Sequence, residues 1–319
     1  MPKVSILVNS YNEDRYIGAA LDSAVAQTYK DVEIIVLDDQ STDRTAEIVK
    51  SYAARDPRVK YLRSERRLGL TDGRNALLAA ATGDYLTYLD ADDMYLPMKV
   101  EEEVNFLEAH RDYAAVYCNL GYFYDDAPEK IYRHIHHFYS GDEVFPHLLE
   151  KMFITNTAFM FRREVYEKLG PYRKDLGLVE DWEYFLRMTY AGNRIAYIDK
   201  DLVRFRLRWD SHTNFAKLAL IKESAVNIFV DLRSRMREED RKKYNIDFHI
   251  AKQKEIWLIT LFSIGKKNEA MKVYGDIKQY VRPAKKAVIL GLAALPSPVA
   301  RFLVLKAWNM RKKNLFSPI

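Results

Sequence analysis

The stretch KVSILVNSYNEDRYIGAALDSAVAQTYKDVEIIVLDD, residues 3–39, sets the architecture of the chain. It opens with an apolar, β-branched run at 3–8 and closes with a second, nearly continuous apolar run at 31–39. Such runs are typical of strands that are buried on both faces of a parallel sheet. Between them, apolar residues recur at the spacing of a helix: Ile17, Leu21, Ala24 and Val25. The stretch therefore predicts a strand, a helix and a second, parallel strand.

The same alternation continues toward residue 93. A helix is expected over 41–57, because a Ser-Thr-Asp capping signal opens it and Pro57 ends it. A strand at 59–63, a helix at 72–83 and a strand at 85–89 follow. Alternating strands and helices predict an α/β fold, Rossmann-like, with a mostly parallel sheet and helices on both faces.

Length and composition predict two domains. A chain of 319 residues can form one large α/β domain and an appendage. We expect helices at 99–110 and 179–192, strands at 114–124 and 194–208, and a domain boundary near residue 213. From 214 to 319 the chain reads as a helical extension, with the charged stretch 233–244 as an exposed turn between helices.

Bulk composition narrows the class of protein. With 48% hydrophobic and 30% charged residues, the chain can bury a core and is not disordered by composition. The net charge of +5 is only mildly basic, and we expect no nucleic acid partner. The single cysteine, Cys118, excludes an intramolecular disulfide and a cysteine-based zinc cluster. The first residues lack the pattern of a signal peptide, which favours the cytoplasm.

Three polar clusters follow three of the predicted strands. They are NSYN at 9–12, DDQS at 38–41 and DADD at 90–93. The carboxyl ends of parallel strands meet at one edge of a sheet, where ligands bind in such folds. The carboxylates of the third cluster repel one another and suit Mg²⁺ or Mn²⁺, which keep positions open for water and phosphate oxygens. The alternative is an acidic surface turn.

Other side chains near this edge have a functional and a structural interpretation. Asp39 could accept a hydrogen bond from a nucleobase imide, and Tyr11 offers a ring for stacking. Either of the aspartates at 38–39 could instead cap the next helix, and Tyr11 could be ordinary packing. Arg74 faces either the same edge or solvent. Glu180 and Asp181 begin a helix, where carboxylates act as partners of the helix dipole or as a general base.

Three quoted segments together carry a family resemblance. Residues 4–45, GLTDGRNALLAAATGDYLTYLDADD at 69–93 and EDWEYFLR at 180–187 occur in that order. The pattern resembles family 2 of the inverting nucleotide-sugar glycosyltransferases, which have the GT-A fold, and it covers residues 3 to about 213. The resemblance implies a single in-line displacement on a nucleoside diphosphate sugar, with Mn²⁺ or Mg²⁺ as cofactor.

The resemblance also implies a role for particular residues. Asp181 is the expected catalytic base, Glu180 acts beside it, and Trp182 helps to position the acceptor. The expected donor-binding residues are Asn9, Tyr11, Glu13, Asp39, Arg74, Asp90 and Arg208. The expected metal ligands are Asp92, Asp90 and His212, with Asp93 in support.

One motif departs from the family pattern. Many relatives carry Tyr-Arg-x-His near the end of the catalytic domain, whereas this chain has Phe-Arg-Leu-Arg at 205–208. Either Arg208 supplies the positive charge near the diphosphate or His212 reaches it from a longer loop. The cluster of His134, His136 and His137 is expected at the surface, where it could contact an acceptor.

The end of the chain is basic and apolar. No acidic residue follows Asp276, and basic residues flank the apolar stretch 287–308. Pro296, Pro298 and Arg301 interrupt that stretch, so we do not expect it to span a membrane. We expect a peripheral patch on the anionic inner face of the cell membrane. The alternative is a helical hairpin packed on the catalytic domain or on a partner subunit.

The predicted function is transfer of a sugar, with UDP-sugar favoured, to a hydroxyl of a glycan or lipid-linked acceptor in surface polysaccharide assembly. TDP remains open because thymine has the same imide as uracil. A sugar-phosphate nucleotidyltransferase is disfavoured because no Gly-rich basic loop follows the first strand. A dehydrogenase is disfavoured because Gly-x-Gly-x-x-Gly is absent there. A catalytically silent nucleotide-sugar-binding subunit is the third alternative. The intact Asp92 and Asp181 argue against it, whereas the altered Phe-Arg-Leu-Arg at 205–208 keeps it open.

Overall fold

The structure, a computed structural model, describes residues 1–133, 138–208 and 215–312. The described residues form two compact units. The first unit contains residues 1–173 and 184–208, and the second contains 174–183 and 215–312. The segment 174–183, which we assigned to the α/β domain, is grouped with the helical unit.

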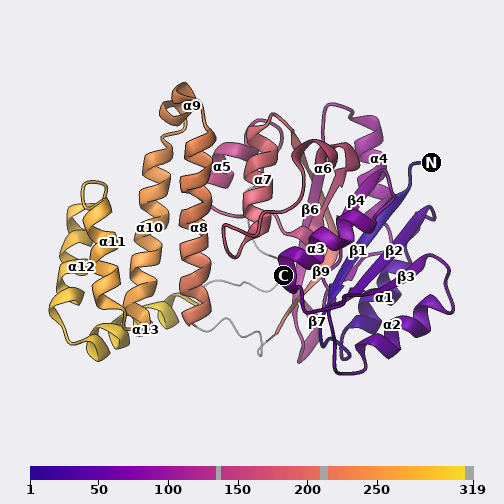
Figure 1. Cartoon of the computed structure of the whole chain (residues 1–319), viewed down its shortest axis with the longest axis horizontal. Helices are drawn as coiled ribbons and strands as arrows, with labels where there is room; N and C mark the ends of the chain where they lie inside the picture. The colour runs from indigo at the N-terminus through magenta and orange to yellow at the C-terminus, as the bar shows by residue number, and fades with distance from the viewer. Residues whose placement is uncertain (134–137, 209–214, 313–319) are drawn as a thin grey trace. The chain divides into compact units, whose positions relative to one another are not determined.

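The first four strands are parallel, as the sequence predicts. They are β1 (Val4–Ser10), β2 (Val32–Asp38), β3 (Val59–Arg63) and β4 (Tyr85–Tyr88). The helices that follow the first three strands are α1 (Ile17–Val25), α2 (Thr45–Ala53) and α3 (Gly69–Ala80). Strand β1 pairs with both β2 and β4, and β2 pairs with β3, all in parallel (Figure 1).

The later strands make the sheet mixed. Within the described residues its order is β3-β2-β1-β4-β8-β6-β9-β5, with β7 paired to β6. These strands are β5 (Met94–Tyr95), β6 (Ala115–Tyr124), β7 (Ala127–Arg133), β8 (Phe159–Arg162) and β9 (Ile195–Leu207). Strand β8 is antiparallel to both β4 and β6, whereas β6 and β9 are parallel. The helical segments here are α4 (Lys99–Ala109), α5 (Val144–Glu150), the 3₁₀ turn Asn156–Ala158, α6 (Arg163–Leu169) and α7 (Glu180–Tyr190).

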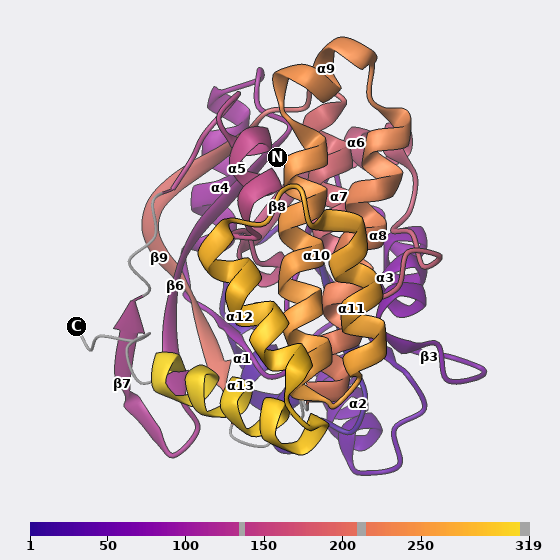
Figure 2. The same ribbon diagram turned by 90° about the vertical axis from the view of Figure 1, so that its left-hand side faces the viewer.

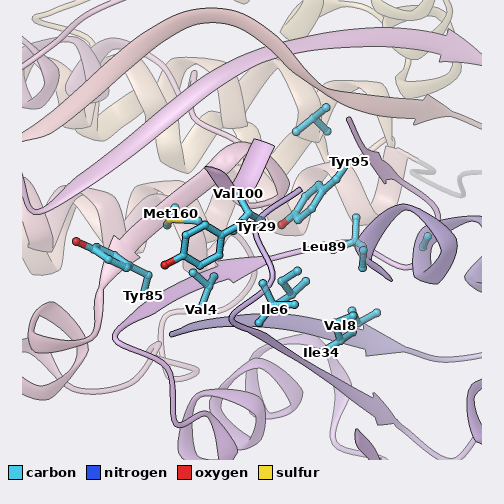
Figure 3. Close-up of a cluster of buried hydrophobic side chains, with 14 of the residues drawn as sticks. Val4, Ile6, Val8, Tyr29, Ile34, Tyr85, Leu89, Tyr95, Val100 and Met160 are labelled. Atoms are coloured by element: carbon cyan, nitrogen blue, oxygen red, sulfur yellow. The ribbon is translucent and has the colours of Figure 1, made fainter. Parts of the chain in front are cut away.

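One face of the sheet carries a continuous hydrophobic cluster. Alternate residues of β1 and β2, among them Val4, Ile6 and Ile34, are fully buried and pack with side chains of α1, α2 and α4 (Figure 3). Because side chains alternate along a strand, Leu7 and Ile35 point to the other face, where α3 contacts both strands. Helices therefore cover both faces of the sheet.

A buried ion pair lies within α4, and its lysine joins that helix to the sheet. Lys99 and Glu103 are both fully buried, and their Nζ and Oε2 atoms are 2.7 Å apart. Lys99 also donates to Thr87 Oγ1 on β4 at 2.9 Å. Burial raises the pKa of Glu103 to about 7, although Lys99 acts in the opposite direction. Lys99 thus fixes α4 against β4. The residues Asp90, Asp92 and Asp93, which we call the acidic cluster, follow this strand.

The second unit is helical. Its helices are α8 (Phe215–Arg235), α9 (Glu238–Lys243), α10 (Ile246–Ser263), α11 (Lys267–Ile277), α12 (Pro283–Ala294) and α13 (Ser297–Lys312). Helix α10 contacts α8, α11 and α13, and α12 contributes Ile289 and Leu292 to the same core (Figure 2). The expected turn at 233–244 contains the short helix α9. Among the described residues, no helix is both long and apolar enough to cross a bilayer.

Candidate active site

The carboxyl ends of β1, β2 and β4 bring the three polar clusters together. Ser10 lies opposite Asp38 in the β1–β2 pairing, and the Asp39 N–H donates to the Ser10 carbonyl. On the other side, the Leu89 N–H donates to the Leu7 carbonyl at the end of β4. Asn12 and Gln40 adopt left-handed φ angles of 53° and 65°. Non-glycine residues in this conformation are uncommon and are concentrated at functional sites.

Asp39 is buried and holds the loop that precedes α3. Its carboxylate accepts hydrogen bonds from Ser64 Oγ at 3.0 Å, Leu68 N at 2.7 Å and Gly69 N at 2.8 Å. It also forms an ion pair with Arg67. A carboxylate has about four acceptor positions, so the protein itself engages most of them. Asp39 therefore has a structural role at the start of α3, whereas the structural alternative from the sequence is a cap on the helix that follows β2.

Tyr11 carries a cation on its ring. The Arg67 guanidinium lies 3.1 Å from the ring centroid, and Tyr11 remains 40% exposed. Arg67 thus connects the loop held by Asp39 to the end of β1. A guanidinium stacked on an aromatic ring gives a flat, positively charged surface at the edge of the sheet.

The start of α3 approaches the ends of β1 and β4. A Cβ atom at Gly73 would lie 2.7 Å from Asn9 Nδ2, so a larger residue there would displace the Asn9 side chain. Asn9 Oδ1 is buried without a hydrogen-bond partner in the described part of the chain. The next residue, Arg74, is 6% exposed and points toward the acidic cluster, where it lies 3.5 Å from Asp90 Oδ1.

The acidic cluster contains carboxylates in different environments. Asp90 and Asp92 are partly exposed, whereas Asp93 is buried and accepts the backbone N–H of Arg206 at 2.9 Å. Burial raises the pKa of Asp92, and Asp90 raises it further, while Arg208 acts in the opposite direction. Burial followed by the two neighbouring carboxylates raises the pKa of Asp93 well above its ordinary value. A further positive charge at this cluster would relieve the repulsion.

The end of β9 supplies arginines to the cluster. Arg208 lies 3.0 Å from Glu13 Oε2 and 3.3 Å from Asp92 Oδ2. Its guanidinium also lies 4.7 Å from the centroid of the Tyr16 ring. Glu13 and Asp92 are far apart in sequence, so Arg208 joins the loop after β1 to the acidic cluster. His212, the alternative cation, lies outside the described residues, as do His134, His136 and His137.

Arg206 supports the acidic cluster from a second direction. Its Nε donates to the Asp92 carbonyl at 2.8 Å, and Nη1 lies 2.7 Å from Asp125 Oδ1. Asp125 also accepts a hydrogen bond from the Tyr16 hydroxyl. The sequence reasoning missed Arg206, Asp125 and Arg67, because each reaches the edge through contacts between distant segments.

The expected catalytic residues belong to the helical unit. Glu180, Asp181 and Trp182 form the first turn of α7. Asp181 Oδ1 accepts the backbone N–H of Trp182 at 2.8 Å, and the Trp182 ring packs edge-on against Phe229 of α8. Glu180 is buried. The described residues that we expect to bind the donor and the metal thus belong to the first unit, whereas this turn belongs to the second.

The donor set fits a hard divalent cation. In the described parts of the chain, no three histidine, cysteine or carboxylate side chains are grouped so that they could hold a metal by themselves. Asp90 and Asp92 offer carboxylate oxygens, and burial and Asp90 both raise the pKa of Asp92. Mg²⁺ and Mn²⁺ bind through one or two carboxylates and take their other ligands from water or phosphate.

The fold and the edge of the sheet define the class. A mixed α/β sheet with acidic, aromatic and basic side chains at its parallel strand ends is the architecture of a GT-A glycosyltransferase. Residues 5–170 match the family described as glycosyl transferase family 2, and the chain belongs to this family. The resemblance noted from the motifs is therefore confirmed, and the dehydrogenase and nucleotidyltransferase alternatives are set aside.

Several known proteins are similar to this chain. An uncharacterised glycosyltransferase of Methanocaldococcus jannaschii is 26% identical over 249 residues, which cover 77% of this chain and 84% of that protein. TarS 1–349 of S. aureus, solved with UDP, has a TM-score of 0.66 at 19% identity and covers 97% of this chain and 91% of that one. The Pyrobaculum calidifontis mannosyltransferase PcManGT, solved with GDP-Man and Mn²⁺, has a TM-score of 0.61 at 20% identity, with coverages of 98% and 87%. These structures share the fold with this chain.

Proposed function

We propose that this glycosyltransferase moves a sugar from a UDP-sugar to a hydroxyl group, with inversion at the anomeric carbon. The observation that carries the proposal is the meeting of Asp90, Asp92, Arg74 and Arg208 at the edge where β1 and β4 end. Carboxylates and guanidinium groups in one place suit a diphosphate that binds together with a divalent cation.

The nucleoside part of the donor fits the Tyr11 surface. A base can stack against the exposed ring, with Arg67 on the same residue adding positive charge. Asp39 would receive an imide N–H only by sharing acceptor positions that Ser64 and Arg67 now use. Uracil is therefore recognised by the loop at 64–69, which Asp39 holds. Asp39 itself accepts the imide N–H once Ser64 or Arg67 has given up its contact with the carboxylate. The TarS structure in complex with UDP-GlcNAc is consistent with this choice of donor.

The diphosphate binds between the acidic cluster and the arginines. Asp90 and Asp92 would hold Mn²⁺ or Mg²⁺, which supplies Lewis-acid stabilisation to the departing diphosphate. Arg208 is preferred to His212 as the protein's own cation, because it already contacts Asp92. Glu13 keeps Arg208 in place, and Asn9 contributes its unpaired amide oxygen beside α3.

The chemical step needs one base and no covalent intermediate. Asp181 removes the proton from an acceptor hydroxyl as that oxygen attacks the anomeric carbon. The bond from the anomeric carbon to the diphosphate oxygen breaks, and the nucleoside diphosphate leaves with the electron pair. Attack opposite the leaving group converts an α-linked donor into a β-glycoside. Glu180 and Trp182 orient the acceptor, which is a glycan or a lipid-linked sugar in surface polysaccharide assembly.

The proposal is tested by replacing the base. Asp181→Asn keeps the shape of the side chain but cannot accept the proton. We expect UDP release from UDP-sugars, measured with water or simple glycosides as acceptors, to fall at least about 100-fold, with UDP affinity unchanged. The matched control is Asp31→Asn, an exposed aspartate at the opposite end of β2, which should behave as the parent protein. Unchanged turnover in Asp181→Asn would refute the assignment of the base.

A further inference from the structure

The outer side of α12 carries an apolar surface that no other described element covers. Eight residues of α12 are exposed, and seven of them have no polar side chain: Pro283, Ala284, Ala287, Val288, Leu290, Gly291 and Ala294. The eighth is Lys285. Val288 is 59% exposed, whereas the next residue, Ile289, is buried. A surface helix of a globular protein normally presents polar side chains to water. The solvent-facing side of α12 therefore has the composition of an interaction surface.

Helix α13 extends the same surface. Phe302 is 63% exposed, and Val299 and Leu303 are also exposed. The buried side of α13 is narrow and includes Ala300. Figure 2 shows α12 and α13, in yellow, in front of α10. Large apolar side chains that are exposed together, rather than singly, mark a contact with another molecule or with lipid.

A groove deepens this apolar surface. It has a volume of about 790 Å³ and is lined mainly by apolar residues of α10, α12 and α13, including Ile256, Ile259 and Leu292. Val288 and Leu303 line it while remaining exposed. Its charged lining residues, Lys285 and Glu255, form an ion pair with each other. The groove could therefore accept hydrocarbon.

Apart from Glu255, which is paired with Lys285, the charged residues that α12, α13 and the segment before them bring to the apolar surface are basic. No acidic residue follows Asp276 in the sequence. Arg282 precedes α12, and Arg301 and Lys306 are exposed on α13. Side chains with one sign of charge around an apolar surface are typical of segments that lie on anionic membranes.

Two features together select the occupant. We call Arg282, Arg301 and Lys306 the basic border. A second copy of the chain would place its basic border against that of the first copy, and repulsion between like charges opposes this contact. Nucleic acid would meet the basic side chains but would leave the apolar side of α12 without a partner. An anionic bilayer satisfies both features, because its headgroups attract the arginines and lysines and its acyl chains receive the exposed apolar side chains. We infer that α12 and α13 form a docking surface for an anionic lipid bilayer. The inference concerns the helical unit and does not depend on the proposed chemistry.

Vesicle sedimentation with the full chain tests the inference. Vesicles of phosphatidylcholine alone are compared with vesicles that contain phosphatidylglycerol at a molar ratio of about 3 to 1. We expect the protein to sediment with the anionic vesicles and to remain in solution with the neutral ones. Added salt should weaken the binding, because it screens the attraction between basic side chains and headgroups.

Two variants separate the apolar from the basic contribution. Phe302→Ser should lower the partition coefficient about tenfold, because an exposed apolar side chain that would enter the bilayer is lost. Phe248→Ser is the matched control, since Phe248 is an exposed phenylalanine at the start of α10. Arg301→Glu should lower the partition coefficient about 30-fold, because the substitution replaces one positive charge by one negative charge and so changes the net charge at the membrane surface by two.

The same experiment can overturn the inference. Equal loss of binding in Phe302→Ser and Phe248→Ser would mean that the α12–α13 surface is not the site. Binding to neutral vesicles as strongly as to anionic ones would remove the role of the basic border. Absence of sedimentation with either vesicle, together with a dimer in sedimentation equilibrium, would assign the surface to contact between copies. Circular dichroism of each variant establishes that a loss of binding does not come from unfolding.

Discussion

The buried pair of Lys99 and Glu103 gives a quantitative test of the structure. Lys99→Met preserves the length of the side chain but leaves Glu103 buried without its cation. Breaking a buried ion pair by removing one partner costs about 3–5 kcal/mol. In a domain of this size that loss lowers the melting temperature by about 6–20 °C. The double variant Lys99→Met/Glu103→Leu removes both charges, and it should unfold close to the parent temperature or above it.

The pH dependence adds an independent check on the pair. Burial raises the pKa of Glu103 from 4.5 to about 7 in the folded protein. The folded state therefore binds a proton more tightly than the unfolded chain, and this group's contribution to stability falls as pH rises from 4.5 to 7. Lys99→Met removes the cation that lowers this pKa, so the Glu103 pKa should rise further. At a pH of about 5 the carboxyl group is protonated and neutral, and at about 8 it must be charged or be protonated at a cost. The loss of stability relative to the parent should therefore be smaller at a pH of about 5 than at about 8.

Urea unfolding of the parent, the single and the double variants, followed by circular dichroism at both pH values, measures these differences. Similar m values are required for the comparison, because the free energies are extrapolated from the transition. A double variant that is less stable than Lys99→Met would refute the reasoning. Such a result would mean that packing, rather than an uncompensated charge, accounts for the effect.

Three further predictions concern the site and the acid limit of stability. Asp39→Asn should reduce the free energy of unfolding by about 1–3 kcal/mol and weaken UDP binding, because two backbone N–H groups lose a charged acceptor; unchanged urea midpoints would contradict this. Arg208→Gln should lower kcat about 100-fold, whereas Arg44→Gln, at an exposed site, should match the parent; an equal loss in both would contradict the role of Arg208. Burial raises the pKa of Glu33, but Lys60 and neighbouring hydrogen bonds outweigh it and hold that pKa well below the ordinary range, so stability should decline as pH falls below about 4.5. Glu33→Gln should flatten that decline in urea titrations, and an acid slope equal to that of the parent would be contrary to the prediction.

The parallel half of the fold is readable from the sequence because its strands are buried on both faces. Apolar residues form most of β1 and β2, and the structure buries every residue of β2. The helices between them have one apolar side each, so their spacing differs clearly from that of a strand. Local pattern and tertiary environment agree in this region, which is why the prediction is correct there.

The later half follows rules that the sequence does not display. Strand β5 contains two residues, which is too short for any periodicity. Strand β7 contains Pro128 and is mostly exposed or partly exposed, as suits the edge of a sheet. The antiparallel insertion of β8 between β4 and β6 depends on contacts between segments that are distant in sequence. Neither the direction nor the neighbours of β8 follow from its four residues.

The site shows the same division. The placement of Asp90 and Asp92 at the same edge of the sheet as the end of β1 follows from parallel pairing, and the sequence predicts it. The contact of Arg208 with Asp92 requires β9 to run beside β6, which only the structure provides. Asp39 illustrates the opposite case, because a conspicuous carboxylate at a strand end is engaged by the loop at 64–69. A side chain's chemistry can be read from sequence, but its partners cannot.

The central claim is that Asp92 and its neighbours hold a metal and a nucleoside diphosphate together. Calorimetric titration of UDP, TDP and GDP into the protein tests it most directly, with Mn²⁺, with EDTA, and in Asp92→Ala. We expect tight UDP binding that requires Mn²⁺ and is lost in Asp92→Ala, while the control Asp31→Asn binds as the parent does. Binding of no nucleotide, or UDP binding that is equal with EDTA and in Asp92→Ala, would contradict it.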